Sequence, residues 1–292
     1  MKVFVIGATG FQGGNIAGAL LKEGHQVTTL KRDPNTGIPP MKGIAVVKGG
    51  LDSQEALAKA MKGAQAAVYS FPLIFDIEIA KTYTNNFIAA VKQENVELII
   101  FNTTFHLPKE ETGFLALDMK VAMKRLLDAS GLNVITLAPD IYIDNISAPW
   151  SIPVILENKI VSYPIVSDKK LPWISHSDLA QYVVKAISKP ELAGQTLPIG
   201  GNLISGKEIT AAISSQIEQD INFIQVPVDE FEQQLVPGFG ELAAREISNL
   251  YRFVEQNHSD FVTKDFDRTN TLLDIQPQTL KEWTDSVNWS IS

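Results

Sequence analysis

A glycine-rich loop between a buried strand and a helix constrains this chain more than any other feature. Residues 3–6 read V-F-V-I, an apolar run without alternation that is typical of a strand covered on both faces of a parallel sheet. Residues 7–13 follow as G-A-T-G-F-Q-G and lead into a helix predicted over Asn15–Glu23 that stops at Gly24. Glycines let the backbone turn tightly and approach a pyrophosphate, and the N–H groups and dipole of a helix N-terminus attract its charge. This context predicts a dinucleotide site formed by Gly7, Thr9, Gly10, Phe11, Gln12 and Gly13.

The alternation of strand and helix continues through the first half of the chain. Strands are predicted at Gln26–Leu30, Ile44–Val47, Ala66–Tyr69, Leu98–Phe101 and Asn133–Leu137. Helices are predicted at Ser53–Met61, Ile77–Gln93 and Leu117–Ala129. Strands that alternate with helices of this length form a parallel sheet with helices on both faces. We therefore expect an α/β fold, a doubly wound parallel sheet of the Rossmann type, over residues 1–146.

The regular alternation of predicted strands and helices ends after Pro139. Four prolines between Pro149 and Pro172 predict a stretch dominated by loops, without a long regular element. Helical spacing returns at Ser177–Ile187 and Lys207–Ile217, with a strand-like Thr196–Ile199 between them. We expect residues 147–292 to form a smaller mixed C-terminal lobe that returns segments to the sheet and is not an independent domain.

The tip of the second predicted strand decides between the two nicotinamide cofactors. An acid there hydrogen-bonds the ribose 2′-hydroxyl of NAD(H), whereas a cationic side chain accommodates the 2′-phosphate of NADP(H). Lys31 and Arg32 come first in L-K-R-D-P, so NADP(H) is preferred over NAD(H). Asp33 lies at the spacing expected for the acid, so the NAD(H) alternative stays open. For Lys31 and Arg32 the alternative without a function is a solvent-exposed turn.

Composition narrows the function classes. The 292 residues carry a formal net charge of -8, which disfavours nucleic acid and anionic membrane surfaces as partners. Cysteine is absent, so thiolate chemistry and cysteine-built metal sites are excluded, and the four histidines show no ligand spacing, so we expect no metal. With neither a signal-peptide core nor a membrane-length apolar run in the sequence, we expect a cytoplasmic protein.

The chain resembles the NmrA-like branch of the atypical short-chain dehydrogenases/reductases. The resemblance rests on the glycine loop, L-K-R-D-P, Gly49–Asp52, Lys120, Pro139–Asn145, Ile174–Ala180, Gly194, Gly200 and Gly201. It implies that further residues line the cofactor: Ser70, Phe71, Pro72, Thr103 and the loop from Pro139 to Tyr142. It also implies that Lys120 contacts the nicotinamide ribose.

Two departures from the family pattern bear on catalysis. Short-chain reductases typically place a tyrosine four residues before the lysine, and here that position is Ala116. Relatives commonly carry an aspartate near the adenine where this chain has Gly50. Lys120 remains as a candidate catalytic residue, with a solvated helix lysine as the alternative. His106, which follows the fifth predicted strand, is a second candidate proton donor.

These observations favour hydride transfer from NADPH to a small carbonyl, enone or quinone-like acceptor. Phe71, Phe105, Tyr142 and Trp150 are candidates for an apolar wall over the nicotinamide, although core packing explains each equally well. The alternative is a non-catalytic NADP(H) sensor of the NmrA type with a regulatory protein partner, which the missing tyrosine supports. A sugar-nucleotide epimerase is a weaker alternative because that reaction needs the tyrosine–lysine pair. The sequence leaves the oligomeric state open.

Overall fold

The computed structural model describes residues 1–292 except 36, 38 and 291–292. The chain forms two compact units, each built from several segments. The first unit holds residues 1–139, 176–199 and 268–275, and the second holds 140–175, 200–267 and 276–292. Segments after residue 146 therefore return to the first unit. The domain boundary at 146 stays a prediction, because these units are defined by contacts and not by independent folding.

The first unit is organised around a seven-stranded parallel sheet. Its order is β10-β6-β5-β4-β1-β2-β3. Strands β2 and β3 lie on one side of β1, and the later strands, from β4 on, lie on its other side, so the strand order reverses between β1 and β4. The strands are β1 (Lys2–Val5), β2 (Gln26–Lys31), β3 (Ile44–Lys48), β4 (Ala66–Ser70), β5 (Leu98–Asn102), β6 (Val134–Ala138) and β10 (Thr196–Pro198). The predicted doubly wound sheet is confirmed, and β10 is the segment that returns to it from the second half of the chain.

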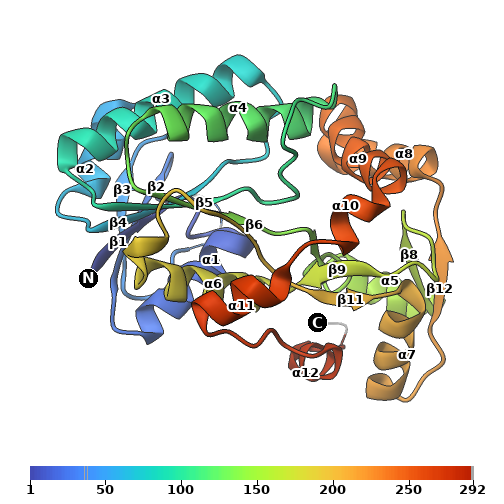
Figure 1. Ribbon diagram of the computed structural model, residues 1–292. Coiled ribbons are helices and arrows are strands. Elements are labelled where there is room, and N and C mark those ends of the chain that lie inside the picture. The colour runs from blue at the N-terminus through green and yellow to red at the C-terminus, as the bar shows by residue number, and fades with distance from the viewer. Residues whose placement is uncertain (36, 38, 291–292) are drawn as a thin grey trace. The chain divides into compact units, whose positions relative to one another are not determined.

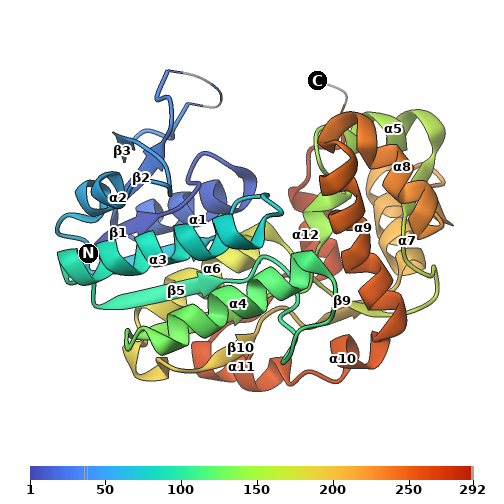
Figure 2. The same cartoon turned by 90° about the horizontal axis from the view of Figure 1, so that it is seen from above.

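Helices cover both faces of this sheet (Figures 1 and 2). One face carries α2 (Gln54–Met61), α3 (Ile77–Glu94) and α4 (Leu115–Ala129), and the other carries α1 (Phe11–Lys22), α6 (His176–Ile187) and α11 (Phe266–Leu273). A 3₁₀ turn, η2 (Pro190–Leu192), precedes β10. Because both faces are covered, Val3, Phe4 and Val5 of β1 are fully buried, which explains why the run does not alternate.

Helix ends follow their capping residues. Ser53 lies one residue before α2 and its hydroxyl accepts a hydrogen bond from the Ala56 amide. Asp76 caps α3 through the amides of Glu78 and Ile79. By contrast α1 begins at Phe11, earlier than the predicted Asn15, because the glycine loop itself winds into the first turn.

The second unit combines two small sheets with short helices. A mixed sheet has the order β11-β9-β7, and β12 pairs in parallel with β8. Its strands are β7 (Ile141–Tyr142), β8 (Ile160–Tyr163), β9 (Leu171–Ile174), β11 (Asn202–Ile204) and β12 (Asn222–Gln225). Its helices are η1 (Ile143–Asn145), α5 (Ser151–Asn158), α7 (Gly206–Ile217), α8 (Val228–Phe239), α9 (Glu241–Gln256), α10 (His258–Val262) and α12 (Leu280–Ser286).

The proline-rich stretch is more regular than its composition predicts. The prediction that loops dominate the stretch between Pro149 and Pro172 was wrong, because α5 and β8 form there and β9 begins at Leu171. Pro153 is the third residue of α5, where no intrahelical partner exists for an amide, so the helix loses no hydrogen bond. Pro172 lies within β9 opposite Leu203 of β11. The elements are nonetheless short, as the prolines require.

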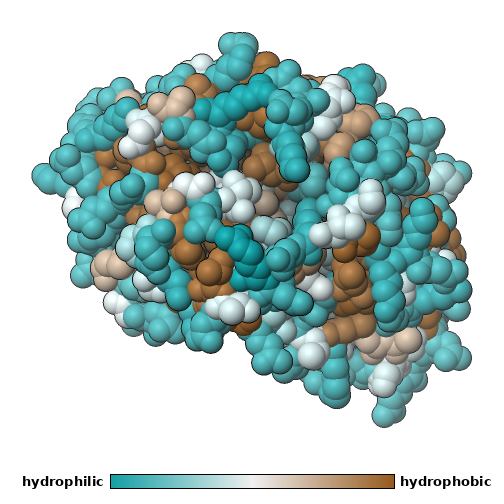
Figure 3. Space-filling view, viewed as in Figure 1, coloured by the Kyte–Doolittle hydropathy of each residue, from teal (hydrophilic) through white to brown (hydrophobic). Residues whose placement is uncertain are grey.

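The surface is mainly hydrophilic on the face shown in Figure 3, with apolar side chains in separate patches. Large apolar side chains with more than half of their surface exposed include Phe11, Leu73 and Trp150. Across the described residues, no helix combines the length and apolarity that crossing a bilayer requires.

Candidate cofactor site

The candidate site residues of the first unit follow the carboxyl ends of its parallel strands. The glycine loop follows β1, Lys31 ends β2, Ser70 ends β4 and Thr103 follows β5. Parallel strands end at one common edge of the sheet, and ligands of open α/β sheets bind outside that edge where the strand order reverses. The reversal between β1 and β4 places this point beside the glycine loop.

The glycine loop forms a tight turn against the helix that follows it. Gly7 has a φ of +69°, and its carbonyl accepts a 2.8 Å hydrogen bond from the Gly10 amide. A Cβ on Gly13 would lie 2.2 Å from the Gly7 oxygen, so only glycine permits this close approach of loop and helix. Gly10 is the N-cap of α1 and provides no side-chain cap, and the first turn contains no acidic residue. The N-terminus of α1 thus presents its positive dipole end without a carboxylate.

A buried amide fastens this loop to the neighbouring strands. Asn102, the fully buried last residue of β5, donates hydrogen bonds to Gln12 Oε1 at 2.9 Å and to Ser70 Oγ at 3.2 Å. Its Oδ1 accepts from the Thr104 amide at 3.0 Å. Thr104 has a φ of +63°, a strained conformation for a β-branched residue. Asn102 therefore holds the loop, β4 and the β5 turn together. Sequence reasoning missed it, and the only signal was a polar residue ending an apolar strand.

Lys120 reaches this turn from α4. Its partly buried ammonium donates to the Thr103 carbonyl at 2.8 Å and to Thr104 Oγ1 at 2.9 Å. An ammonium has three donors, so one N–H has no acceptor within the described part of the chain. Burial lowers the pKa of Lys120 to about 8 because the charged form loses hydration. The side chain is therefore held in place at the strand edge and is not a freely solvated helix lysine.

The tip of β2 presents cationic side chains. Arg32 is exposed and makes no hydrogen bond or ion pair within the residues that the structure describes. A Cβ on Gly50 would lie 3.5 Å from Arg32 Nε and 2.4 Å from Asp52 Oδ1. The Asp52 carboxylate thus fills the space in which a side chain at position 50 would begin. Asp33 Oδ1 accepts a hydrogen bond from the Asn35 amide in the turn that follows.

The remaining predicted residues are distributed over both units. Phe71 follows Ser70, and its ring lies tilted against that of Tyr83, with ring centroids 6.3 Å apart. His106 is buried in the loop after β5, and Pro139 follows β6. Tyr142 belongs to the second unit, in β7, so its relation to the glycine loop is not defined. The roles of all these residues stay predictions.

A buried alanine, Ala116, occupies the position at which short-chain reductases typically have a tyrosine. Ala116 lies in the first turn of α4, four residues before Lys120. A methyl group there can neither donate a proton nor lower the pKa of a neighbour. Any acid–base chemistry at this edge therefore depends on other groups.

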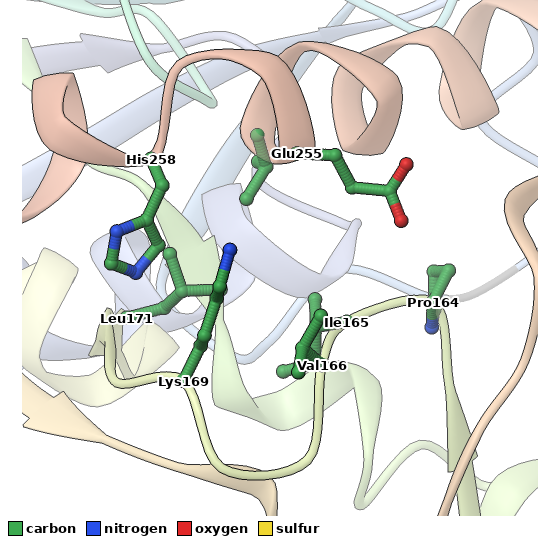
Figure 4. A pocket seen from close by; sticks show the side chains of 8 residues that line it. Pro164, Ile165, Val166, Lys169, Leu171, Glu255 and His258 are labelled. Atoms are coloured by element: carbon green, nitrogen blue, oxygen red, sulfur yellow. The ribbon is translucent and has the colours of Figure 1, made fainter.

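A second, small pocket lies beside His258, and its described lining contains no glycine loop or helix N-terminus of the kind found after β1 (Figure 4). It belongs to the second unit and has a volume of about 170 Å³. Lys169 comes from the segment between β8 and β9, while Glu255 and His258 come from α9 and α10. His258 Nε2 lies 2.9 Å from the Lys170 carbonyl oxygen. Among the described residues no three carboxylates or histidines converge in the manner of a metal site.

Comparison with known proteins identifies the family. The model of the NmrA-like family matches residues 1–284. The chain belongs to the NmrA-like family. Phenylcoumaran benzylic ether reductase TP7 of Nicotiana tabacum is 22% identical to this NmrA-like chain over 285 residues, which cover 89% of each chain.

Solved structures share the fold across the whole of this NmrA-like chain. Triphenylmethane reductase of Citrobacter sp., solved with NADP(H), is 18% identical with a TM-score of 0.78 and covers 98% of this chain and 100% of its own. NmrA, a negative transcriptional regulator solved with NADP, is 16% identical with a TM-score of 0.76 and covers 98% and 94% of the two chains. The family's fold thus occurs both in a reductase and in a regulator.

Proposed function

We propose that this NmrA-like protein binds NADP(H) and reduces a small carbonyl, enone or quinone-like molecule. The observation that carries the proposal is the N-terminus of α1, which has no side-chain cap from Gly10 and no acidic residue in its first turn, behind a glycine loop that tolerates no side chain at Gly13. Such a terminus is suited to a pyrophosphate. Relatives named as reductases and a fold neighbour solved with NADP(H) support the same reading.

The residues at the strand edge fit the parts of a dinucleotide. The positive dipole end of α1 behind the glycine loop suits the pyrophosphate, and the remaining N–H of Lys120 suits a ribose hydroxyl. Arg32 has no carboxylate partner among the described residues, so its guanidinium is available to a 2′-phosphate. Asp33 is engaged by a turn amide, which makes it a weaker candidate for a 2′-hydroxyl. These features favour NADP(H) over NAD(H).

The nicotinamide, when bound, supplies the hydride. Ala116 has no proton to give, so the acceptor's proton comes from Lys120 or from water. Burial sets the pKa of Lys120 at about 8, close to the neutral range in which a general acid works best. The contacts to Thr103 and Thr104 fix the direction of the ammonium. Lys120 thus orients the ribose and is the candidate proton donor, while His106 stays a second candidate.

A non-catalytic NADP(H) sensor is the second candidate function. Two observations favour it, namely the alanine at position 116 and the fold neighbour that is a transcriptional regulator. In that case the bound molecule is a signal, and the partner is a regulatory protein.

The experiment that tests the proposal has two stages. Calorimetric titration with NADPH and NADH should show binding, with NADPH the tighter. Absence of binding for both would remove the proposal and the sensor alternative together. NADPH oxidation is then followed by absorbance with a panel of quinones, enones and aromatic ketones. Turnover with any of them supports the reductase, and binding without turnover supports the sensor.

A further inference from the structure

One side chain, Asn102, connects the glycine loop to the turn that Lys120 contacts. Asn102 is fully buried, and both ends of its amide make hydrogen bonds. A backbone N–H can only donate, so the bond from the Thr104 amide identifies the oxygen end, Oδ1. The nitrogen end, Nδ2, therefore faces Gln12 and Ser70. The orientation of this amide is fixed by its partners.

The oxygen end of Asn102 acts on the conformation of Thr104. Thr104 has a φ of +63°, in the left-handed region that a β-branched residue normally avoids. Such a conformation persists only where neighbouring groups impose it. The 3.0 Å hydrogen bond from the Thr104 amide to Asn102 Oδ1 holds this part of the backbone. Without that acceptor, we expect Thr104 to return to an ordinary φ.

The conformation of Thr104 decides what Lys120 contacts. Lys120 Nζ donates to the Thr103 carbonyl at 2.8 Å and to Thr104 Oγ1 at 2.9 Å. Thr103 is held by the sheet, because its amide donates to the Leu137 carbonyl of β6 at 3.1 Å. Within the described part of the chain, Thr104 makes no hydrogen bond to β6. Of the two acceptors of Lys120, one is therefore held by β6 and the other by Asn102.

The nitrogen end of Asn102 acts on the glycine loop. Gln12 is the second residue of α1, between Gly10 and Gly13, and its Oε1 accepts from Asn102 Nδ2 at 2.9 Å. Ser70, at the end of β4, accepts from the same nitrogen at 3.2 Å. The glycines offer no side chains that could pack against the sheet. The bond to Gln12 is therefore a fixed point of the loop relative to the strand ends.

We propose that Asn102 is a positioning residue that sets both the glycine loop and the direction of the Lys120 ammonium. It acts on the loop through Gln12 and on the lysine through the left-handed turn at Thr104. The inference rests on the proposed function, in which the loop binds a pyrophosphate and Lys120 contacts the ribose. One buried amide thus keeps the two parts of the cofactor site in register.

Three single variants of the full-length protein separate the two effects. Thr104→Val has no hydroxyl, so it removes only the acceptor of Lys120. Gln12→Met removes only the acceptor in the loop. Asn102→Leu has nearly the same shape as the wild type and removes both bonds. Circular dichroism and thermal unfolding show whether each variant is folded.

The first readout is the pKa of Lys120, followed by NMR of ¹³C-labelled lysine without nucleotide and assigned with Lys120→Met. Burial lowers this pKa to about 8, and no charged side chain contributes to the shift. In Thr104→Val the charged form loses an acceptor, so the pKa should fall by about one further unit. Asn102→Leu should produce the same fall, and the variant with both substitutions should fall no further, because both act on one hydrogen bond. Gln12→Met should leave the pKa unchanged.

The second readout is NADPH affinity, measured by calorimetry. Gln12→Met and Asn102→Leu should each weaken binding by about tenfold, and together no more than either alone, because both break the same bond. If the wild type does not bind NADPH, the proposed function fails. The pKa of Lys120 still decides the inference in that case, because it is measured without nucleotide.

Asn102→Asp is the conservative control, and it also serves if Asn102→Leu does not fold. Its carboxylate keeps an acceptor for the Thr104 amide but has no N–H for Gln12. NADPH affinity should therefore fall, whereas the pKa of Lys120 should stay or rise, because a negative charge favours the protonated lysine. A pKa that is unchanged in Asn102→Leu, effects that add in the double variants, or a lowered pKa in Asn102→Asp would each overturn the inference.

Discussion

The glycine loop of the first unit and a cavity in the second unit are built in two different ways. The loop in the first unit is made almost entirely of backbone, since Gly7, Gly10 and Gly13 matter for the side chains they lack. The cavity in the second unit has a volume of about 510 Å³ and is made of side chains from η1, α5, β8, α8 and α9, and the hydrogen-bonded hydroxyls of Tyr163 and Tyr251 belong to its lining residues. A backbone site depends on residues adjacent in sequence, whereas a side-chain site depends on packing. The two should therefore respond differently to substitution.

The largest effect is expected at Gly13. Gly13→Ala places a Cβ 2.2 Å from the Gly7 oxygen, so the loop or the helix must move. NADPH affinity should fall by more than about 100-fold, and stability should fall by about 1–3 kcal/mol. Calorimetry measures the NADPH affinity, and urea unfolding measures the free energy of unfolding.

Gly14→Ala is the matched control for this prediction. A Cβ there meets nothing closer than the Ala8 oxygen at 3.6 Å, an ordinary contact. It should keep NADPH affinity and gain some helix stability. If both variants bind NADPH equally well, the loop is not the cradle that we describe.

Removing the cation at the tip of β2 should have the next largest effect. Arg32→Ala should weaken NADPH by about 1.5–3 kcal/mol through loss of charge-assisted hydrogen bonds. NADH has no 2′-phosphate and should be nearly unaffected. Titrations of both nucleotides decide the matter, and equal losses would show that Arg32 does not contact the 2′-phosphate.

Lys120 should make stability depend on pH. The pKa is about 8 in the folded protein and about 10.4 in an unfolded chain, so the unfolded state binds more protons between these values. Burial of the charge is fully unfavourable below pH 8, and this cost disappears as the pH rises to about 10.5. The free energy of unfolding of the wild type, relative to Lys120→Met, should rise by about 2 kcal/mol over that interval. A difference independent of pH would mean that the lysine keeps its ordinary pKa.

The smallest effect is expected at the cavity wall. Leu235→Ala truncates an α8 side chain that lines the cavity and already faces empty space, so it should cost less than about 1 kcal/mol and leave NADPH affinity unchanged. Leu57→Ala removes a fully buried side chain from the first unit's core and should cost about 2–5 kcal/mol. Equal costs in urea unfolding would indicate that the α8 face is part of a packed core and not the wall of a cavity.

Sequence reasoning worked where a feature is local in the chain. The strand at residues 3–6, the loop after it and the helix start at Ser53 depend on residues within a few positions of one another. It failed in the proline-rich stretch, where proline content predicted loops. The four residues of β8 pair with β12, a strand some 60 positions away, and that partner cannot be read from local composition.

The site shows the same division. The amino-acid sequence by itself determined the parallel sheet, the glycine loop and the cationic tip of β2, because glycine geometry and hydrophobic periodicity are properties of adjacent residues. Only the tertiary structure placed Asn102 against Gln12, fixed Lys120 on the β5 turn and brought Tyr163 to Tyr251 across 88 positions. Such contacts depend on which buried surfaces pack together, and packing is decided by the whole chain at once.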